Sequence, residues 1–258
     1  MKWIQSIENP FIKEIRRIKK QPNEKIFIEG INLIESALES CFVRIEKVLV
    51  TKQFMEKYGE KFFQDKELEI VGISEEISKK ISDTVTPQGI FSVASFKMKN
   101  LNEVKNPTLI TIVDKVQDPG NLGTIIRASE ALGADAVLII PGTCNPLSGK
   151  VLRASAGSIF FIPVIKASVR ETEEFIAQCR LTLVITDLKA KLLCFDMDYT
   201  QPIAVAFGNE SHGVSEELRK ISHINCRIPH KGKTESLNVA MAATVLLYEV
   251  LRQRFKAF

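Results

Sequence analysis

The sequence predicts an α/β protein whose second half is built on a parallel sheet. After residue 108, near-continuous apolar segments alternate with segments of helical periodicity, a pattern typical of parallel strands that are buried on both faces between helices. Leu109–Val113 and Ala136–Ile140 are the clearest strands, and Leu122–Leu132 is the helix between them. We therefore expect a C-terminal parallel sheet with helices on both faces, preceded by a smaller N-terminal α/β domain.

The remaining elements follow from the same periodicities. In the second half, strands are expected at Ile159–Ile165, Leu181–Thr186 and Ile203–Phe207, and a long helix at Ser236–Arg254. In the first half, strands are expected at Lys25–Glu29, Arg44–Thr51, Glu67–Ile73 and Gly89–Phe96, and helices at Asn9–Lys20, Ile31–Glu39 and Ser74–Ser82. Residues 97–107 are polar, lack clear periodicity and end in Pro107, which predicts a linker between domains 1–96 and 108–258.

Composition places the chain among globular proteins. Hydrophobic residues make up 45% of its 258 residues and charged residues 26%, enough apolar material for a sizeable core. A net charge of +4 permits an anionic partner without requiring one. No apolar run is long enough to cross a bilayer, and the N-terminus lacks the apolar block of a secretion signal. We therefore expect a cytoplasmic protein with no membrane partner.

The cysteines indicate neither a metal site nor a disulfide framework. There are five of them, and none forms the closely spaced pair that a structural zinc site uses. We expect reduced cysteines that serve as small apolar residues, and no bound metal.

Three polar segments stand at the ends of expected strands. The first, residues 114–127, leaves the strand Leu109–Val113 and enters a helix that Asn121 can cap. Gly123 permits close approach to the first helical turn, and Arg127 follows Asn121 by six residues. Because ligands of open α/β sheets bind at the carboxyl ends of strands, this segment is a candidate for a site.

The second segment, residues 207–215, follows the strand Ile203–Phe207. Its glycines and polar residues suit a loop that holds a ligand with backbone groups. The fingerprint G-x-G-x-x-G is absent from the chain, which argues against a nucleotide-dependent oxidoreductase. His212 is a candidate base, although a single loop histidine is more often a solvated side chain.

The third segment, residues 228–240, is a basic loop that leads into the last helix. We expect this helix to begin at about Ser236, with Thr234 or Glu235–Ser236 as its cap. Asn238 would then lie in the first turn, where asparagine is a mediocre helix former, so a side-chain contact is expected for it. Lys231 and Lys233 are candidates for phosphate contact, with a solvated loop as the alternative.

The first expected helix is also basic. An apolar stripe within Asn9–Lys20 is formed by Phe11, Ile12, Ile15 and Ile18, and cationic side chains cover the rest. An ordinary solvated face explains this pattern, and contact with RNA phosphates explains it only if the rest of the chain points to nucleic acid. The candidate RNA-binding residues of this helix are Lys13, Arg16, Arg17 and Lys20.

Together, the three segments resemble the three motifs of the SpoU/TrmH family of SPOUT methyltransferases, from about residue 108 to the C-terminus. Residues 1–96 resemble the small substrate-binding domain of several members, chiefly through Glu29-Gly30 followed by a helix. The resemblance implies a trefoil-knotted sheet, a homodimer formed through the catalytic domain, S-adenosylmethionine as methyl donor and an RNA ribose 2′-hydroxyl as acceptor.

The resemblance also implies roles for particular residues. Active-site positions match Asn121, Arg127, Glu210, Ser236 and Asn238. Donor-binding positions match Thr186, Leu188, Gly208, Asn209, Gly213, Ile228 and Leu237. Arg153 matches a basic position linked to RNA binding.

Methyl transfer to a ribose hydroxyl requires close placement of the reactants and a proton acceptor. In the family, the arginine at the position of Arg127 is given the role of base. A guanidinium is permanently charged, however, and more naturally clamps a phosphate or orients the hydroxyl. Ribosomal RNA is the favoured substrate because of the additional N-terminal domain. Transfer RNA as substrate, or a catalytically silent RNA-binding or ribosome-assembly factor, are the alternatives.

Overall fold

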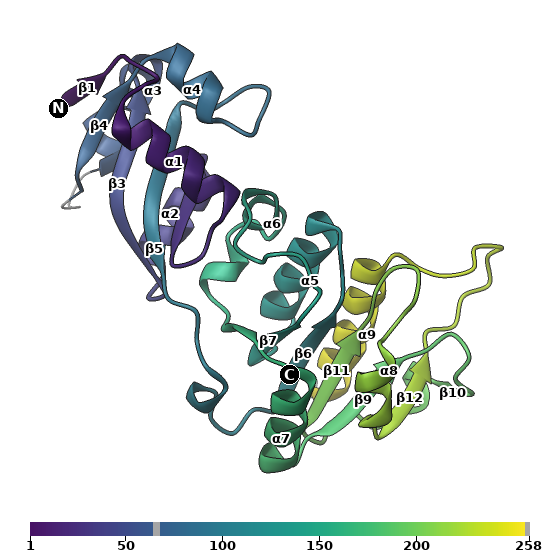
Figure 1. Ribbon diagram of the computed structural model, residues 1–258. Coiled ribbons are helices and arrows are strands. Elements are labelled where there is room, and N and C mark those ends of the chain that lie inside the picture. The colour runs from purple at the N-terminus through teal and green to yellow at the C-terminus, as the bar shows by residue number, and fades with distance from the viewer. Residues whose placement is uncertain (64–67, 256–258) are drawn as a thin grey trace. The chain divides into compact units, whose positions relative to one another are not determined.

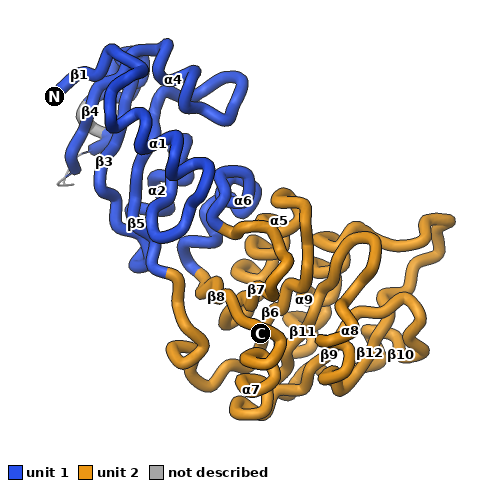
Figure 2. Tube along the Cα trace, viewed as in Figure 1, with its two compact units in different colours: residues 1–97, 147–161 blue, residues 98–146, 162–258 orange. Residues whose placement is uncertain are grey.

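The structure is a computed structural model that describes residues 1–63 and 68–255 (Figure 1). The chain divides into two compact units (Figure 2). The first is formed by residues 1–97 and 147–161, and the second by residues 98–146 and from 162 onward. Segment 147–161 belongs by sequence to the expected second domain, but it packs with the first unit.

The first unit is a five-stranded mixed sheet with order β1-β4-β3-β5-β2. Its strands are β1 Lys2–Ile4, β2 Lys25–Glu29, β3 Val43–Thr51, β4 Ile70–Ile73 and β5 Ile90–Phe96. Its helices are α1 Pro10–Lys20, α2 Ile31–Glu39, α3 Lys52–Tyr58, α4 Glu75–Ile81 and α6 Gly149–Ala154. The expected strand Glu67–Ile73 is observed from Ile70 onward, and Glu67 lies outside the described residues.

Helix α1 forms for the reasons that its sequence indicates. Asn9 caps it by accepting a hydrogen bond from the backbone N–H of Phe11, and Pro10 occupies the first turn, where no N–H is needed. Ile12, Ile15 and Ile18 are buried in the apolar core of this unit, while the cationic positions lie on the other faces.

Segment 147–161 corrects one expected strand. Ile159–Ile165 was expected to be extended, but Ser158–Phe160 form a 3-10 helix and the strand β8 covers only Val164–Lys166. Gly157 introduces this helix with a left-handed φ of 91°, and Ile159 and Phe160 are fully buried. A short apolar run fits either a buried strand or a buried helical turn, so periodicity could not decide between them.

An ion-pair network fastens segment 147–161 within the first unit. Asp83 lies 2.7 Å from Lys19 Nζ and 3.1 Å from Arg153 Nη1. Beside it, the buried carboxylate of Glu29 accepts hydrogen bonds from the Asp83 N–H at 2.9 Å and from Thr84 Oγ1 at 2.8 Å. Burial alone would raise the pKa of the Asp83 carboxyl, but hydrogen bonds and charge attraction from Lys19 and Arg153 outweigh it and hold that pKa below its usual value.

The second unit is a seven-stranded sheet with order β10-β12-β9-β11-β6-β7-β8, and every neighbouring pair is parallel. Its strands are β6 Leu109–Asp114, β7 Ala136–Ile140, β8 Val164–Lys166, β9 Thr182–Thr186, β10 Leu192–Leu193, β11 Ile203–Phe207 and β12 Ile224–Arg227. Its helices are α5 Pro119–Ala131, α7 Val169–Cys179, α8 Glu216–Lys220 and α9 Val239–Arg254. The expected parallel sheet with helices on both faces is confirmed.

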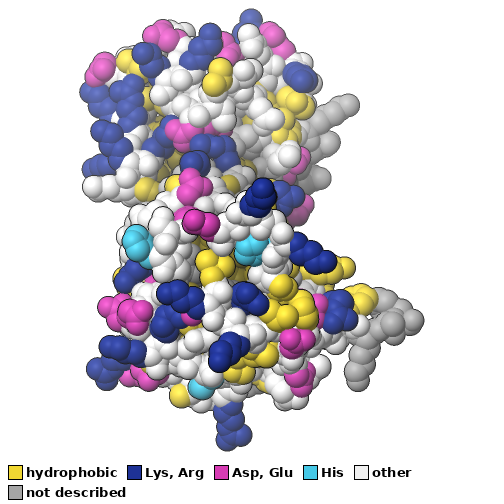
Figure 3. Space-filling model, turned by 90° about the vertical axis from the view of Figure 1, so that its right-hand side faces the viewer, with side chains coloured by type: hydrophobic (Ala, Val, Ile, Leu, Met, Phe, Trp, Pro, Cys, Tyr) yellow, Lys and Arg dark blue, Asp and Glu magenta, His cyan; other side chains and the backbone are white. Residues whose placement is uncertain are grey.

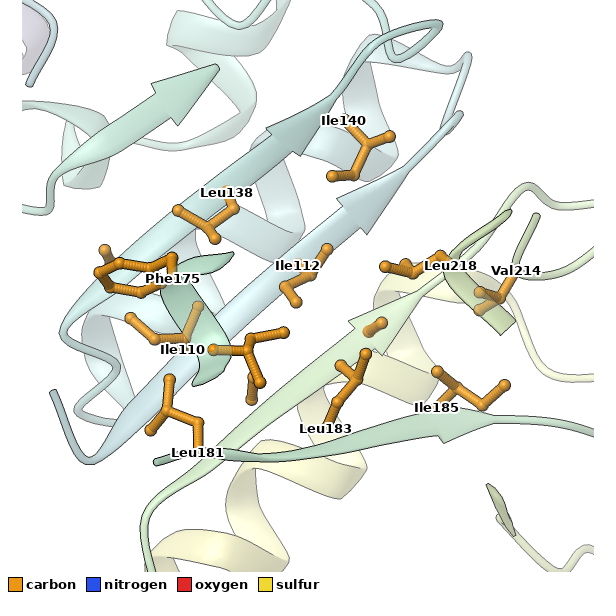
Figure 4. Packing of buried hydrophobic residues seen from close by; sticks show 14 of the residues in the cluster. Ile110, Ile112, Leu138, Ile140, Phe175, Leu181, Leu183, Ile185, Val214 and Leu218 are labelled. Carbon is orange, nitrogen blue, oxygen red and sulfur yellow. The ribbon is translucent and has the colours of Figure 1, made fainter. Parts of the chain in front are cut away.

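The two faces of this sheet have separate helical covers. Helices α7 and α8 cover one face and α5 and α9 the other (Figure 1). Ile110 and Ile112 of β6 point towards the α7–α8 side, where they pack in a cluster with Phe175 and Leu218 (Figure 4). On the opposite side, Ser129 Oγ of α5 donates to Thr111 Oγ1 at 3.0 Å. Burial on both faces explains why these strands are continuously apolar in sequence.

The parallel arrangement brings distant segments to one edge. Strands β6, β9, β11 and β12 are neighbours in the sheet and all run in the same direction. The segments that leave their carboxyl ends, beginning at residues 115, 187, 208 and 228, therefore lie along the same edge of the second unit.

We expect the Asp83 network to make stability depend on pH. Because its folded pKa is depressed, Asp83 stabilises the fold above its unfolded value of about 4, and this contribution disappears as the pH falls through the folded pKa. Asp83→Asn should therefore lower the free energy of unfolding by about 1 kcal/mol at pH 7, with a difference from wild type that shrinks below pH 4.

Urea unfolding at several pH values measures this difference. Glu8→Gln is the matched control, because the Glu8–Lys13 pair at 2.6 Å is highly exposed and should contribute little. An Asp83→Asn variant no less stable than Glu8→Gln at pH 7 would contradict the expected role of the network.

Candidate active site

The side chains of Asn121, Glu210 and Asn238 join the three motif segments. Asn121 Nδ2 donates to Glu210 Oε1 at 2.8 Å, and Asn238 Nδ2 donates to Asn121 Oδ1 at 2.9 Å. A carboxylate only accepts, so the amide nitrogen of Asn121 must face Glu210, and its oxygen is left for Asn238. The three residues thus form one directed chain of hydrogen bonds across the edge of the sheet.

Helix α5 positions Asn121 in this chain. We expected Asn121 to cap the helix, which is wrong: Asp118 is the cap and accepts from the Asn121 N–H at 2.9 Å, followed by Pro119 in the first turn. Asp118 satisfies the helix N-terminus, so the Asn121 side chain is not needed as a cap and reaches Glu210 and Asn238 instead.

Helix α9 positions Asn238. The expected start near Ser236 is wrong, because the helix begins at Val239 and Asn238 itself is the cap. Asn238 Oδ1 accepts from the N–H groups of Ala240 at 2.9 Å and Met241 at 3.3 Å. The expected side-chain contact of Asn238 is present, and its amide combines a capping acceptor with a donor to Asn121.

The surroundings of Glu210 favour its charged form. Burial alone would raise its pKa, but hydrogen bonds from the Asn121 side chain and from backbone N–H groups of residues 210, 118 and 117 outweigh it and lower the pKa. Glu210 is therefore an ionised acceptor at neutral pH, as the direction of the hydrogen-bond chain requires.

The loop that carries Glu210 is fixed at both ends. Asn209 and Gly213 form an isolated antiparallel bridge, and Asn209 Nδ2 donates to the Lys115 carbonyl at 3.0 Å. A Cβ on Gly208 would lie 2.1 Å from the backbone of Gly213 and Val214, so only glycine fits there. The buried Asp114 carboxylate accepts from the Ser215 N–H at 2.6 Å and ties the far end of the loop to β6.

A cavity of about 1050 Å³ opens beside this loop. All seven expected donor-binding residues line it, namely Thr186, Leu188, Gly208, Asn209, Gly213, Ile228 and Leu237. Glu210, Ser236 and Asn238 share its wall. The walls combine apolar side chains with backbone and polar groups, and the volume is at the upper end of typical small-molecule sites of about 300–1,000 Å³.

Comparison with known proteins agrees with this geometry. Residues 108–248 match the model of the SpoU rRNA Methylase family, and residues 9–92 match the MRM3-like substrate binding domain. A Bacillus subtilis relative, 23S rRNA (guanosine(2553)-2'-O)-methyltransferase RlmP, is 30% identical over 97% of this chain and 99% of its own. The chain belongs to the SpoU methylase family.

Solved structures of family members share the whole fold. The SpoU methyltransferase AviRb from Streptomyces viridochromogenes, in complex with AdoMet, superposes with a TM-score of 0.89 at 25% identity, covering 97% of this chain and 100% of its own. An rRNA methyltransferase from Sinorhizobium meliloti superposes with a TM-score of 0.87 at 26% identity, covering 99% of each chain. The family resemblance predicted from the three motifs and the N-terminal domain is confirmed.

Arg127 lies apart from the other expected active-site residues of this methylase. It is exposed on α5, six residues beyond Asn121, and it is not part of the cavity wall. Six residues correspond to about one and two-thirds helical turns, so the two side chains point in different directions. One copy of the protein therefore brings together four of the five expected active-site residues, namely Asn121, Glu210, Ser236 and Asn238.

The basic residues expected to bind RNA fall into two groups. Lys and Arg side chains gather along one side of the first unit (Figure 3), and Lys13, Arg17 and Lys20 are exposed on α1 with Arg16 partly so. Arg153 is instead paired with Asp83. In the second unit, Lys231 and Lys233 are exposed in the loop before α9.

Sequence reasoning missed several acidic residues that shape the site. Asp118 was identifiable, since an Asp–Pro pair before a helical pattern is a start signal. Asp187 pairs with Arg219 of α8 and accepts from the Lys189 N–H at 2.9 Å, which fixes the segment carrying Leu188. No local sequence signal identifies this pair, or the role of Asp114, because both depend on segments far apart in sequence.

Within residues 1–63 and 68–255, no three His, Cys, Asp or Glu side chains are grouped as metal ligands. Over the same residues, no helix combines the length and apolar character that a membrane span needs.

Two substitutions at Asn238 separate its roles. Asn238→Asp keeps the capping oxygen but replaces the donor to Asn121 with a second oxygen, so we expect stability near that of wild type and methyl transfer reduced about tenfold, the equivalent of one lost hydrogen bond of about 1.4 kcal/mol. Asn238→Ala loses both roles and should also lower stability by about 1 kcal/mol.

Urea unfolding and turnover on RNA measure the two effects. Asn225→Asp is the control with the same chemical change. Asn225 is exposed on β12 and its oxygen accepts from Ser222 Oγ at 3.1 Å, whereas its side-chain nitrogen donates to no group among the described residues. Wild-type turnover by Asn238→Asp would show that the bond to Asn121 has no part in activity.

Proposed function

We propose that this protein transfers a methyl group from S-adenosylmethionine to a ribose 2′-hydroxyl of RNA, most favourably of ribosomal RNA. The observation that carries the proposal is the Glu210–Asn121–Asn238 chain of hydrogen bonds beside a cavity whose wall contains every residue expected to bind the donor. The full-length likeness to RlmP, whose name specifies 2′-O-methylation of 23S rRNA, supports the substrate.

The residues present fit the donor. Gly208 lets the backbone of the loop close on itself where any Cβ would collide, which leaves backbone groups at the cavity wall rather than a side chain. Leu188, Ile228 and Leu237 supply apolar walls for an adenosyl group, while the polar groups of Thr186 and Asn209 supply hydrogen bonds. When bound, S-adenosylmethionine supplies an electrophilic methyl group.

This chain's residues then have distinct tasks. The Glu210–Asn121–Asn238 chain holds three segments rigidly, so that a bound ribose meets the same arrangement of polar groups each time. Ser236, on the same cavity wall, offers a hydroxyl for hydrogen bonding to the substrate. Arg127 supplies a forked, permanently charged donor that suits the phosphate next to the target ribose.

We further propose that the protein acts as a homodimer formed through the catalytic domain. Met241, Val245 and Tyr248 recur at helical spacing on α9 with 64%, 47% and 59% of their surface exposed. The position of Arg127 outside the cavity wall of its own chain supports a site that a second copy completes. The trefoil knot and the cytoplasmic location stay predictions from the family resemblance and the sequence.

RNA methylation mapping tests the activity and its substrate. We expect cells that lack the gene to lose one ribose methylation in ribosomal RNA, restored by the wild-type gene but not by Arg127→Ala. Arg127→Lys should also lose most activity, because a point charge does not reproduce the planar fork. A lost site in transfer RNA would instead identify that substrate, and no change in either pool would favour a silent RNA-binding factor.

Charge insertion on α9 tests the dimer. Val245→Glu places a carboxylate in the exposed apolar surface and should shift the protein from dimer to monomer in analytical ultracentrifugation, with loss of methyl transfer. Ala177→Glu, at an exposed position of α7, is the control and should leave the dimer intact. A wild-type protein that sediments as a monomer at micromolar concentration would contradict the proposal.

A further inference from the structure

His212 is the one histidine on the loop that carries Glu210, and its ring contacts a residue of fixed orientation. Its Nδ1 lies 3.1 Å from Asn209 Oδ1. The Asn209 amide cannot be reversed, because its Nδ2 donates to the Lys115 carbonyl at 3.0 Å and its Oδ1 accepts from the Ser211 N–H at 3.0 Å. The histidine ring therefore faces an oxygen that only accepts.

This contact determines which ring nitrogen carries the proton. An acceptor opposite Nδ1 requires Nδ1–H, so in the neutral ring the lone pair is on Nε2. Asn209 Oδ1 also accepts from the His212 backbone N–H at 3.1 Å, which holds the backbone of His212 in place beside Asn209. Asn209 thus orients His212 as an acceptor through Nε2.

The surroundings of His212 include the rest of the site. It lines the same cavity as Glu210, Ser236 and Asn238. The other titratable groups on that wall are Asp187 and Lys189 after β9, Glu216 and Arg219 of α8, and His230 and Glu235 before α9. Glu210 and Asp187 are poor proton acceptors, because the pKa of each carboxyl is lowered despite burial. Hydrogen bonds lower the pKa of Glu210, and hydrogen bonds together with the charges of Arg219 and Lys189 lower the pKa of Asp187.

We propose that His212 is the proton acceptor for the ribose 2′-hydroxyl, an inference that rests on the proposed function. The hydroxyl oxygen forms its bond to the methyl carbon while its proton passes to His212 Nε2. The electron pair of the broken carbon–sulfur bond stays on sulfur, and the imidazolium then releases the proton to water. Arg127 keeps its proton throughout and acts only as a clamp.

His212→Asn tests this role with little change to the loop. The asparagine amide can still donate to Asn209 Oδ1 as Nδ1–H does, but nothing replaces Nε2. We expect kcat at pH 8 to fall about 100-fold, while the KM values for RNA and donor stay within about twofold. The wild-type kcat should decline as the pH is lowered, because a protonated base cannot accept the hydroxyl proton, and this decline should vanish in His212→Asn.

The other two of the chain's three histidines supply the matched variants. His223 Nδ1 accepts from the Leu183 N–H at 2.7 Å, a contact that Asn preserves, and His230 Nε2 contacts the Thr234 carbonyl at 2.9 Å. His223→Asn and His230→Asn should both keep the decline of kcat with acid. Loss of the decline in His230→Asn, or its survival in His212→Asn with kcat within threefold of wild type, would overturn the proposal.

The protonated nitrogen can be observed without turnover. Nitrogen-15 NMR of the neutral imidazoles, with only three histidines to assign, should show the His212 proton on Nδ1. A proton on Nε2 would overturn the proposal by itself. A wild-type protein that methylates no RNA would instead contradict the proposed function, whereas an active wild type with an unaffected His212→Asn variant would contradict only the role of His212.

Discussion

The side-chain amide of Asn121 is the contact on which the site depends. An amide has one group that donates and one that accepts, and here the donor serves Glu210 at 2.8 Å while the acceptor serves Asn238 at 2.9 Å. Each partner begins or follows a different element: Asn238 caps α9, and Glu210 lies in the loop after β11. A residue with only donors or only acceptors could not join both, because Glu210 accepts and Asn238 donates. The sheet topology brings an acceptor and a donor to position 121, and a side-chain amide can bind both.

The parallel sheet and the location of the site were predictable from the sequence. Continuous apolar strands predicted burial on both faces, and polar segments after those strands predicted a site at their carboxyl ends. The caps of α5 and α9 were predicted wrongly, because Ser, Thr, Asp and Asn all cap well and more than one of them stands near each of these two helix starts. Asp118 caps α5 so that Asn121 is available for other contacts, and this choice becomes visible only once Glu210 is brought to the same edge.

Segment 147–161 shows a different limit of sequence reasoning. Ile159 and Phe160 are as apolar as strand residues, but their burial is achieved within the first unit, where Phe160 lies 6.2 Å from the ring of Phe96. Periodicity reports that a residue is buried and does not report which core buries it. Pairwise contacts such as Arg153 with Asp83 are likewise hidden, since 70 residues separate the partners.

The same ion pair bears on how RNA would be bound. With a net charge of only +4, the protein must attract RNA through local groups of cations rather than through its overall field. Arg153 already forms an ion pair with Asp83 at 3.1 Å. To contact an RNA phosphate, its guanidinium would have to exchange the Asp83 carboxylate for that phosphate. Arg17 and Lys20 are exposed on α1, and neither would have to give up an ion pair with Asp83 to contact a phosphate. Electrostatic attraction of RNA to the first unit should therefore depend on α1 more than on Arg153, which mainly holds segment 147–161 in place.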